Sequence, residues 1–577
     1  MRGTGAGTFT ILWRAFFAQF FTSDTVSSDD ELRRQMVWIL AFLLLPGILL
    51  LIELFFDYQG IVLRAIRYQQ FDHLDDTLEW VAFLFVTYSM VSVGLIAVCE
   101  WDALVFDRRD AMVLSPLPLR GATIVTAKVA ALGAFLLAAS ATVNLSNAVV
   151  FAFATGDRLG LEALVRHFAG ILTSTFAAAA FVFAALVVIR GVVDLLAGPR
   201  VAAAIGSLLQ FVFVLALLGI VILCPAVWRV PHRELVNPTV TGWLPSSWFT
   251  GMFEQIRGSR RIYFHPLAVR AWVATAAVMA GAVVTSIAAF HRQMQRALTP
   301  GAVPRAAVAV RLTRMLARGL VGRDTVAAAT ADFILLTIAR NRQQQTLIAV
   351  NAAVGVALVG ADLAQVRNFT ALAPASMTVL WIPLVLAYWL AVGCRAAFFV
   401  PSELPAAWTF AANAPAGAAT HWSAVRATMI AAVVPPTMVV AFAITAPLAG
   451  SAIAALHTLF VTLVAIVLVE VAALTIDFVP FTRAYEPGHA KLKTRWWLYL
   501  LGVYAFARWP IHIELSVIHR PAAFVTVLAT LSVAIVAFEL AGRRRSGSWS
   551  IQAPEYSADP FASITVLDLR GFVVGSG

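Results

Sequence analysis

Twelve long apolar runs constrain this chain more than any other feature of its sequence. A helix of roughly 20 apolar residues crosses the hydrocarbon core of a bilayer and satisfies its own backbone hydrogen bonds there. We therefore predict an all-α polytopic membrane protein with about 12 transmembrane helices. The runs 346–363 and 496–511 are the weakest, because Asp362 shortens the first while Arg508 and Pro510 interrupt the second, so ten to twelve spans is the expected range. The runs lie at about 36–56, 80–99, 129–154, 168–189, 201–224, 271–290, 346–363, 371–394, 427–449, 452–476, 496–511 and 521–538.

The composition agrees with a membrane location. Of the 577 residues, 60% are hydrophobic and only 13% are charged, whereas soluble domains are about half apolar and about a quarter charged. These values exclude a soluble enzyme and a receptor with a single membrane anchor. The net charge of +11 could favour nucleic acid or an acidic membrane surface, and in so apolar a chain we expect membrane lipid and no nucleic acid.

The distribution of basic residues predicts the orientation of the spans. If the N-terminus is cytoplasmic, 29 of the 42 Lys and Arg residues fall in cytoplasmic segments and 13 fall on the other side. Cytoplasmic loops carry such an excess, so we expect a multi-pass protein with both termini in the cytoplasm. We expect it in the cell (plasma) membrane, as a prokaryotic inner-membrane protein.

The two halves of the chain look like copies of one unit of six spans. Because each copy has an even number of spans, the copies would run parallel, related by an axis along the membrane normal. Short motifs recur at the ends of equivalent spans with nearly constant offsets. The matched positions are Cys99 with Cys394, Pro118 with Pro415, and Lys128 with Arg426.

An amphipathic helix is predicted before each set of six spans. In the first half, apolar residues recur at three- and four-residue steps over 9–21, which indicates either a helix in the membrane interface or one packed on the protein's own spans. In the second half, the segment 333–340 is its counterpart, within a basic linker. The predicted domains are the first six-span half 1–290, the cytoplasmic linker 291–344, the second half 345–541 and a cytoplasmic tail 542–577.

The segment 101–128, WDALVFDRRDAMVLSPLPLRGATIVTAK, is the most informative stretch of the chain. A charged cluster is followed by apolar residues, then by two prolines, and a basic residue opens the next span. This pattern resembles the cytoplasmic loop between spans two and three of the type-2 ATP-binding-cassette exporter permeases. The corresponding residues here are Arg108, Arg109, Asp110, Leu114, Pro116 and Pro118.

This resemblance implies a function and a partner. In that family the loop carries a short coupling helix that docks onto a dimer of ATPase subunits, so the chain would be the permease subunit of an exporter, with two halves fused. No GxxxxGK[ST] phosphate loop occurs in the sequence, so ATP would be bound by the partner chain and no cofactor by this one. No basic vestibule, aromatic cage or selectivity motif identifies the substrate.

A cluster of acidic residues before the second span suggests an alternative function. Asp72, Asp75, Asp76 and Glu79, with His73, could hold a divalent cation, and membrane-embedded glycosyltransferases that use lipid-linked sugars place acidic residues in their first external loop. The plainer interpretation is a solvated acidic loop on the side that the charge rule leaves poor in Lys and Arg.

Polar residues inside the apolar runs suggest a second alternative. Glu470 lies deep in the tenth run, where an ionisable group is either paired structurally with another polar side chain, the interpretation that we favour, or functional. A functional Glu470 would suit a proton-coupled secondary carrier. His457 is too far along the same helix to pair with Glu470 directly. Asn144 and Asn147 lie one helical step apart in the third run and would join helices or line a path.

No sequence constellation supports an enzyme. The chain has no HExxH, GxSxG or CxxC motif, so we predict neither catalytic residues nor metal ligands. The three cysteines stand at the ends of apolar runs, where we expect small buried side chains.

Overall fold

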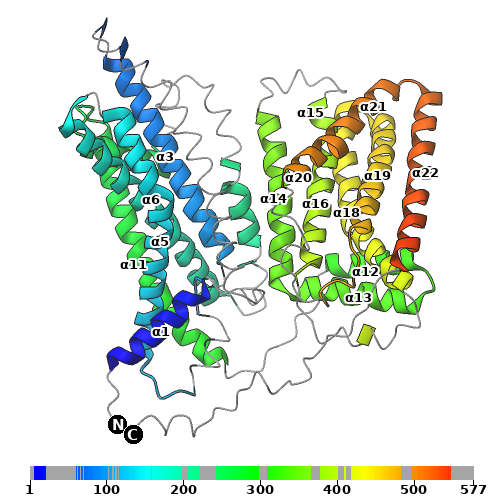
Figure 1. The fold of residues 1–577 in the computed structure, drawn as a ribbon, viewed down its shortest axis with the longest axis horizontal. Coiled ribbons are helices and arrows are strands. Elements are labelled where there is room, and N and C mark those ends of the chain that lie inside the picture. Colours follow the sequence, from blue (N-terminus) through cyan, green and yellow to red (C-terminus); the bar gives the residue numbers. More distant parts are fainter. Residues whose placement is uncertain are drawn as a thin grey trace, which may run out of the picture. The chain divides into compact units, whose positions relative to one another are not determined.

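In the computed structural model, the regular secondary structure of the described residues is helical. The described residues are 5–20, 60, 63–64, 67–68, 71–101, 103–106, 110, 114, 116–156, 159–197, 205–206, 208–217, 219–220, 242–297, 308–364, 377–400, 409–410, 418–482 and 496–547. All regular elements within these ranges are helices, which confirms the all-α fold class (Figure 1).

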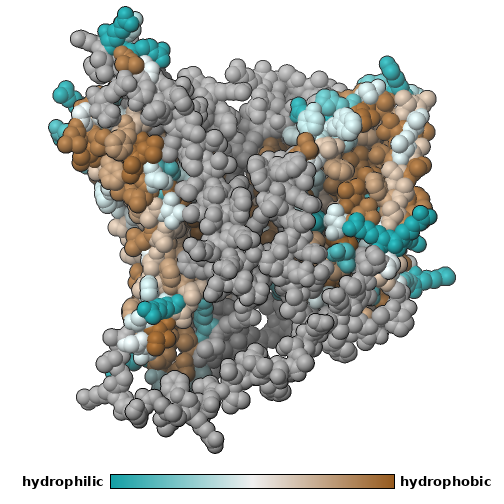
Figure 2. Space-filling model, in the orientation of Figure 1, coloured by the Kyte–Doolittle hydropathy of each residue, from teal (hydrophilic) through white to brown (hydrophobic). Residues whose placement is uncertain are grey.

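Among the described residues, seven helices are long and apolar enough to cross a membrane. They correspond to the predicted runs two, three, four, six, nine, ten and twelve, and shorter apolar helices overlap runs five, seven and eight. The first run, 36–56, lies outside the described residues. Apolar side chains cover much of the outward surface of these helices, with polar residues toward their ends (Figure 2). The chain is therefore a membrane-embedded helical protein.

The fold divides into two compact units. One comprises 1–304 with 356–367, and the other comprises 305–355 with 368–577. The division after Pro304 falls inside the predicted linker 291–344. Two helices extend across the predicted domain boundaries. One continues past residue 290 to Ala297, and another begins at Arg342, before residue 345.

The first unit is a bundle centred on α6. This helix packs against α3, α5, α10 and α11, and α1 packs on α5. Small residues permit these close contacts, since Ala178 and Ala179 of α6 are fully buried. The helices of this unit are α1 (Gly5–Gln19), α3 (Phe71–Cys99), α5 (Gly121–Gly156), α6 (Leu161–Leu196), α10 (Pro245–Arg257) and α11 (Phe264–Ala297).

The second unit is a bundle centred on α18 and α19. These helices pack against each other, against α16 and against α22, while α12 and α13 both contact α18. The helix α14 (Arg342–Ala364) has residues in both units. The other helices of this unit are α12 (Val308–Val321), α13 (Thr325–Arg340), α15 (Met377–Leu380), α16 (Ile382–Phe398), α18 (Ala418–Ala449), α19 (Ser451–Leu474), α20 (Trp496–Val503), α21 (Trp509–Val517) and α22 (Pro521–Ser546).

The neighbours of equivalent helices match between the units. The helix α5 packs on α1, α3 and α6, and α18 packs in the same order on α13, α16 and α19. The last long helix of the first unit, α11, packs on α5 and α6. The last long helix of the second unit, α22, packs on α18 and α19. The predicted repeat requires these relations. The repeat of two complete six-span copies stays a prediction, because the first span lies outside the described residues.

The weak eleventh run is one helix with a local change of pitch. A π-helical turn, η5 (Tyr504–Arg508), joins α20 to α21 and ends where Pro510 enters the first turn of α21. A widened turn tolerates a missing backbone donor, and such turns interrupt otherwise regular helices. The interruption predicted at Arg508 and Pro510 is therefore a π-turn within a continuous helix.

Close backbone packing at Gly251 gives a first testable prediction. A Cβ atom at this position of α10 would lie 2.7 Å from Cβ of Leu267 and 3.0 Å from the carbonyl oxygen of Phe264. We expect Gly251→Ala to lower the free energy of unfolding by about 1–3 kcal/mol, because α10 and α11 would be forced apart. Thermal unfolding of the purified protein, monitored by size-exclusion chromatography, measures the loss of stability.

Gly133→Ala is the matched control on α5. Nothing lies within 4 Å of a Cβ atom there, and alanine is the better helix former by up to about 1 kcal/mol. This variant should unfold at or above the wild-type temperature. Equal melting of the two variants would show that α10 does not pack on α11 as described.

Candidate functional sites at the two ends of the first unit

The predicted coupling loop follows α3 and packs onto α1 and the start of α5. Leu12 and Phe16 of α1, Phe106 and Leu114 of the loop, and Phe290 near the end of α11 are buried in one apolar cluster. The helix α1 thus packs on the protein's own spans, which was one of the two predicted arrangements. Figure 1 shows α1 running across the end of the bundle at which α5 begins.

A buried lysine holds the loop in place. The Lys128 side chain is 1% exposed, its Nζ donates to Oε1 of Gln19 at 3.0 Å, and it lies 3.8 Å from Oδ2 of Asp110. Gln19 in turn donates to Oδ1 of Asp110 at 2.7 Å. The rings of Phe16 and Phe106 lie 4.9 and 5.8 Å from the ammonium. A buried cation needs such compensation, so Lys128 joins α1, the loop and α5. We call Lys128, Asp110 and Gln19 the lysine tie.

The loop separates into a buried and an exposed part. Asp110 belongs to the lysine tie and Leu114 is buried in the apolar cluster, whereas Pro116, Leu117 and Pro118 are exposed. Arg108 and Arg109 lie outside the described residues. Of the predicted coupling residues that are described, only the two prolines are therefore accessible to a partner, together with Leu117, which sequence analysis had not singled out.

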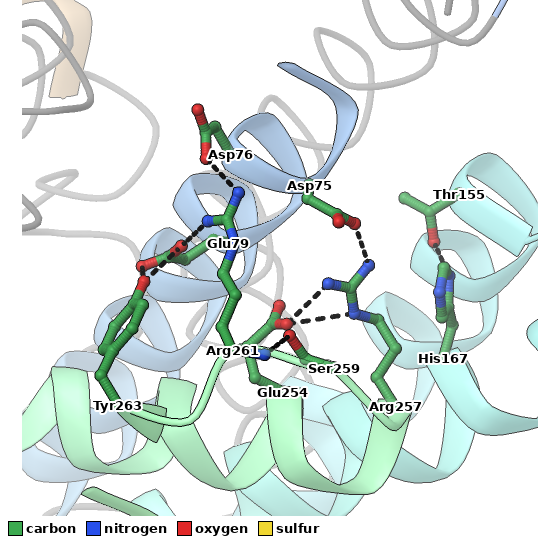
Figure 3. A network of polar contacts seen from close by, with 10 residues as sticks. All are labelled: Asp75, Asp76, Glu79, Thr155, His167, Glu254, Arg257, Ser259, Arg261 and Tyr263. Atoms are coloured by element: carbon green, nitrogen blue, oxygen red, sulfur yellow. Dashed lines mark hydrogen bonds and ion pairs between the residues drawn. The ribbon is translucent and has the colours of Figure 1, made fainter. Parts of the chain in front are cut away.

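At the other end of α3, the acidic cluster meets the short helix α10. Pro245 stands in the first turn of α10, and Gly258 ends the helix with a φ of 88°, a left-handed conformation that glycine adopts without strain. The chain then turns back, and Ser259 and Arg261 lie beside the first turns of α3 (Figure 3). The left-handed turn at Gly258 thus brings Arg261 against α3, beside Arg257 at the end of α10.

Arg257 joins α10 to α3. Its guanidinium donates to Oε2 of Glu254 at 2.6 and 3.2 Å and to Oδ1 of Asp75 at 2.8 Å. Glu254 is 1% exposed, and burial raises its pKa above the ordinary value, although the Arg257 charge acts against that rise. Its other oxygen, Oε1, has no partner among the described residues.

Arg261 and Tyr263 complete the network one turn further along α3. Arg261 donates to Asp76 at 2.6 Å and to Glu79 at 3.0 Å, and the Tyr263 hydroxyl donates to both Glu79 oxygens at 2.9 and 3.0 Å. Burial, followed by the Glu79 charge, raises the pKa of Tyr263, so it acts as a neutral donor. We call Asp76, Glu79, Arg261 and Tyr263, together with Arg257, Glu254 and Asp75, the arginine clamp (Figure 3).

The structure corrects the solvated-loop interpretation for the three acidic residues whose side chains it describes, while the side chains of Asp72 and His73 lie outside the described ones. Asp75, Asp76 and Glu79 lie on the first turns of a helix and are paired with arginines, so they do not form a solvated loop. Within the described part of the chain, no group of three or more His, Cys, Asp or Glu side chains is arranged to hold a metal ion. Arg257 and Arg261 were not predicted as members of this site, because they stand 182 positions away from Asp75 and Glu79 in the sequence.

Glu470 in the second unit is paired rather than free. The guanidinium of Arg426 on α18 bonds Oε1 of Glu470 and lies 3.3 Å from Oε2 of Glu539 on α22. Glu470 is fully buried, and its Oε2 has no partner within the described structure. Arg426 is the residue matched to Lys128 in the predicted repeat. In both units, the matched basic residue of α5 or α18 holds a carboxylate.

A second buried pair was not predicted. His457 on α19 lies 2.9 and 3.0 Å from the two oxygens of Glu514 on α21, and both side chains are fully buried. The helical spacing predicted that His457 does not pair directly with Glu470, and the structure gives each of the two residues a different partner. Glu514 lies just beyond the predicted run 496–511, and no sequence pattern pointed to it.

The two asparagines of the third run are both buried in α5. Asn147 donates to the carbonyl oxygen of Val143 within its own helix at 2.8 Å. Asn144 Nδ2 is buried and has no partner among the described residues. For the described residues, neither asparagine has a side-chain bond that joins α5 to another helix.

Comparison of the chain with models of protein families, with curated proteins and with solved structures finds no significant match.

The arginine clamp gives a second prediction. Arg257→Gln leaves Glu254 buried without its cation, so we expect the free energy of unfolding to fall by about 3–5 kcal/mol. Because Arg257 lowers the pKa of Glu254, the carboxyl group of the variant takes up a proton at higher pH and becomes neutral. The loss should therefore be larger near pH 8 than near pH 5, as thermal unfolding at the two pH values would measure.

Arg166→Gln is the matched control for the clamp. Arg166 forms an exposed pair with Glu162 on α6, and such pairs contribute less than about 1 kcal/mol. Adding Glu254→Gln to Arg257→Gln should recover stability at pH 8, because the uncompensated charge is removed. Equal melting of Arg257→Gln and Arg166→Gln at both pH values would contradict the clamp.

Proposed function

We propose that this protein is the permease subunit of an ATP-binding-cassette exporter of the type-2 kind, energised by a separate dimer of ATPase subunits. In this proposal it resides in the cell membrane with both termini in the cytoplasm. The lysine tie is the observation that carries the proposal. A loop that receives force from a partner must be attached firmly to the helices it moves, and Lys128 attaches this loop to both α1 and α5.

The exposed part of the loop supports a docking role. Pro116, Leu117 and Pro118 are exposed next to a buried anchor, and proline limits the conformations that an exposed segment can adopt. A rigid apolar projection suits insertion into a groove of a partner protein. The ATPase contact in this proposal consists of these three residues.

The proposed mechanism follows from these attachments. ATP binding closes the ATPase dimer, which pushes on Leu117 and the adjoining prolines. The lysine tie carries the displacement to α1 and to α5, which has 36 residues and so is about 54 Å long at 1.5 Å per residue. The arginine clamp, at the far end of the same bundle, keeps α10 on α3 during the motion. The two halves then rock and open a path for the substrate.

Leu117→Glu tests the proposed contact. We expect the amount of ATPase that co-purifies with the tagged protein from native membranes to fall at least about tenfold, which corresponds to about 1.4 kcal/mol. The charged side chain would have to be desolvated in the groove. Quantitative mass spectrometry of the bound proteins measures the change.

Leu161→Glu is the control for this experiment. Leu161 is also an exposed leucine, but it begins α6 at the end of the bundle where α5 finishes. ATPase binding should be unchanged in this variant. The proposal fails if the wild-type protein brings down no ATPase under gentle detergent conditions, or if Leu117→Glu binds it as well as Leu161→Glu does.

A further inference from the structure

The helix α12 has three different faces. Ala317 is fully buried against α13 and α18, with Val321 packed beside it. On the opposite face, the large apolar side chains are exposed, with Met315 at 70% and Leu312 at 57%. At about 100° per residue, exposed Leu316 falls beside Leu312 on this face, whereas exposed Leu320 lies at its border with the buried face.

Arginines flank the exposed apolar face on one side. Arg314 and Arg318 both bond Asp332 of α13, Arg314 at 3.0 and 2.8 Å. Although partial burial acts against it, these hydrogen bonds hold the pKa of Asp332 below its ordinary value. The carboxylate is therefore charged at neutral pH and fixes α12 on α13. Arg311, one turn earlier, is exposed.

The helix lies at the arginine-rich end of its unit. Thr330 of α13 is 3.0 Å from His421 in the first turn of α18, and a Cβ atom at Gly542 near the end of α22 would meet Trp422. The start of α18 is thus beside the end of α22, where Arg543, with its two basic neighbours, closes the helix. Figure 1 shows α12 and α13 lying across the direction of the long helices at this end.

We propose that α12 is a lipid-binding helix that inserts its apolar face into the headgroup region of a leaflet rich in anionic phospholipid. Met315 and Leu312 contact acyl chains, and Arg311 and Arg318 contact lipid phosphates. This inference does not depend on the proposed ATPase partner. An apolar face bordered by arginines, on a helix fixed across the end of membrane-spanning helices, matches an interfacial helix in charge and in shape. Cytoplasmic leaflets carry the complementary negative charge.

The experiment measures the depth of spin labels in the full-length protein reconstituted in lipid nanodiscs. The natural Cys99, Cys224 and Cys394 are first replaced, and a label is attached at Met315→Cys or at the exposed Arg323→Cys in the turn after α12. We expect the ratio of oxygen accessibility to that of a water-soluble nickel complex to be at least about threefold higher at position 315. Equal ratios at the two positions, or shielding of position 315 from both reagents, would overturn the proposal, because the face would then be in water or covered by protein.

The charge requirement is tested with the same label. Replacing half of the phosphatidylcholine in the nanodisc with phosphatidylglycerol should increase the depth at position 315. Arg311→Gln should reduce that increase without changing the depth in pure phosphatidylcholine. Arg166→Gln, on an exposed arginine of the first unit, is the control and should leave the increase intact. A depth that does not respond to phosphatidylglycerol would refute the preference for anionic lipid.

Discussion

The cost of burying a charge determines how this helical bundle is held together. An ionised group inside an apolar bundle needs a compensating charge, and each buried cation described above has one. Lys128 has Asp110 and Gln19, Arg257 has Glu254 and Asp75, and Arg426 has Glu470. Asp110 and Gln19 for Lys128, Asp75 for Arg257 and Glu470 for Arg426 come from another segment of the chain, whereas Glu254 lies on the same helix as Arg257. The charges therefore specify which helices meet, while the apolar contacts supply most of the burial.

Helices could be predicted from the sequence where it shows a long apolar run or an amphipathic helical period. Run length identified seven helices that the structure describes as long enough to span, and the amphipathic pattern around Phe16 located α1 and its buried face. The match between Lys128 and Arg426 identified two basic residues that both hold carboxylates. These signals are local, because an apolar stripe or a basic residue at a helix start can be recognised without knowing its neighbours.

The pairing of distant residues could not be predicted in the same way. Asp76 and Arg261 are separated by 185 positions, and their contact depends on the left-handed turn at Gly258, which no hydropathy pattern encodes. The acidic cluster therefore looked like a loop, and pairing was expected for Glu470 without its partner Arg426 being identified. Hydropathy indicates that a residue is buried in a bundle, but the helix that it meets depends on packing between surfaces far apart in sequence.

The two charged clusters of the first unit also limit how that unit can move. The lysine tie holds the end of the bundle where α5 begins, and the arginine clamp holds the opposite end of α3. Breaking either one leaves a buried charge without its partner, at a cost of several kcal/mol. Rigid-body movement avoids that cost, because it keeps every internal ion pair intact. A force applied to the exposed loop should therefore displace the bundle as a whole rather than bend it, as a rocking mechanism requires.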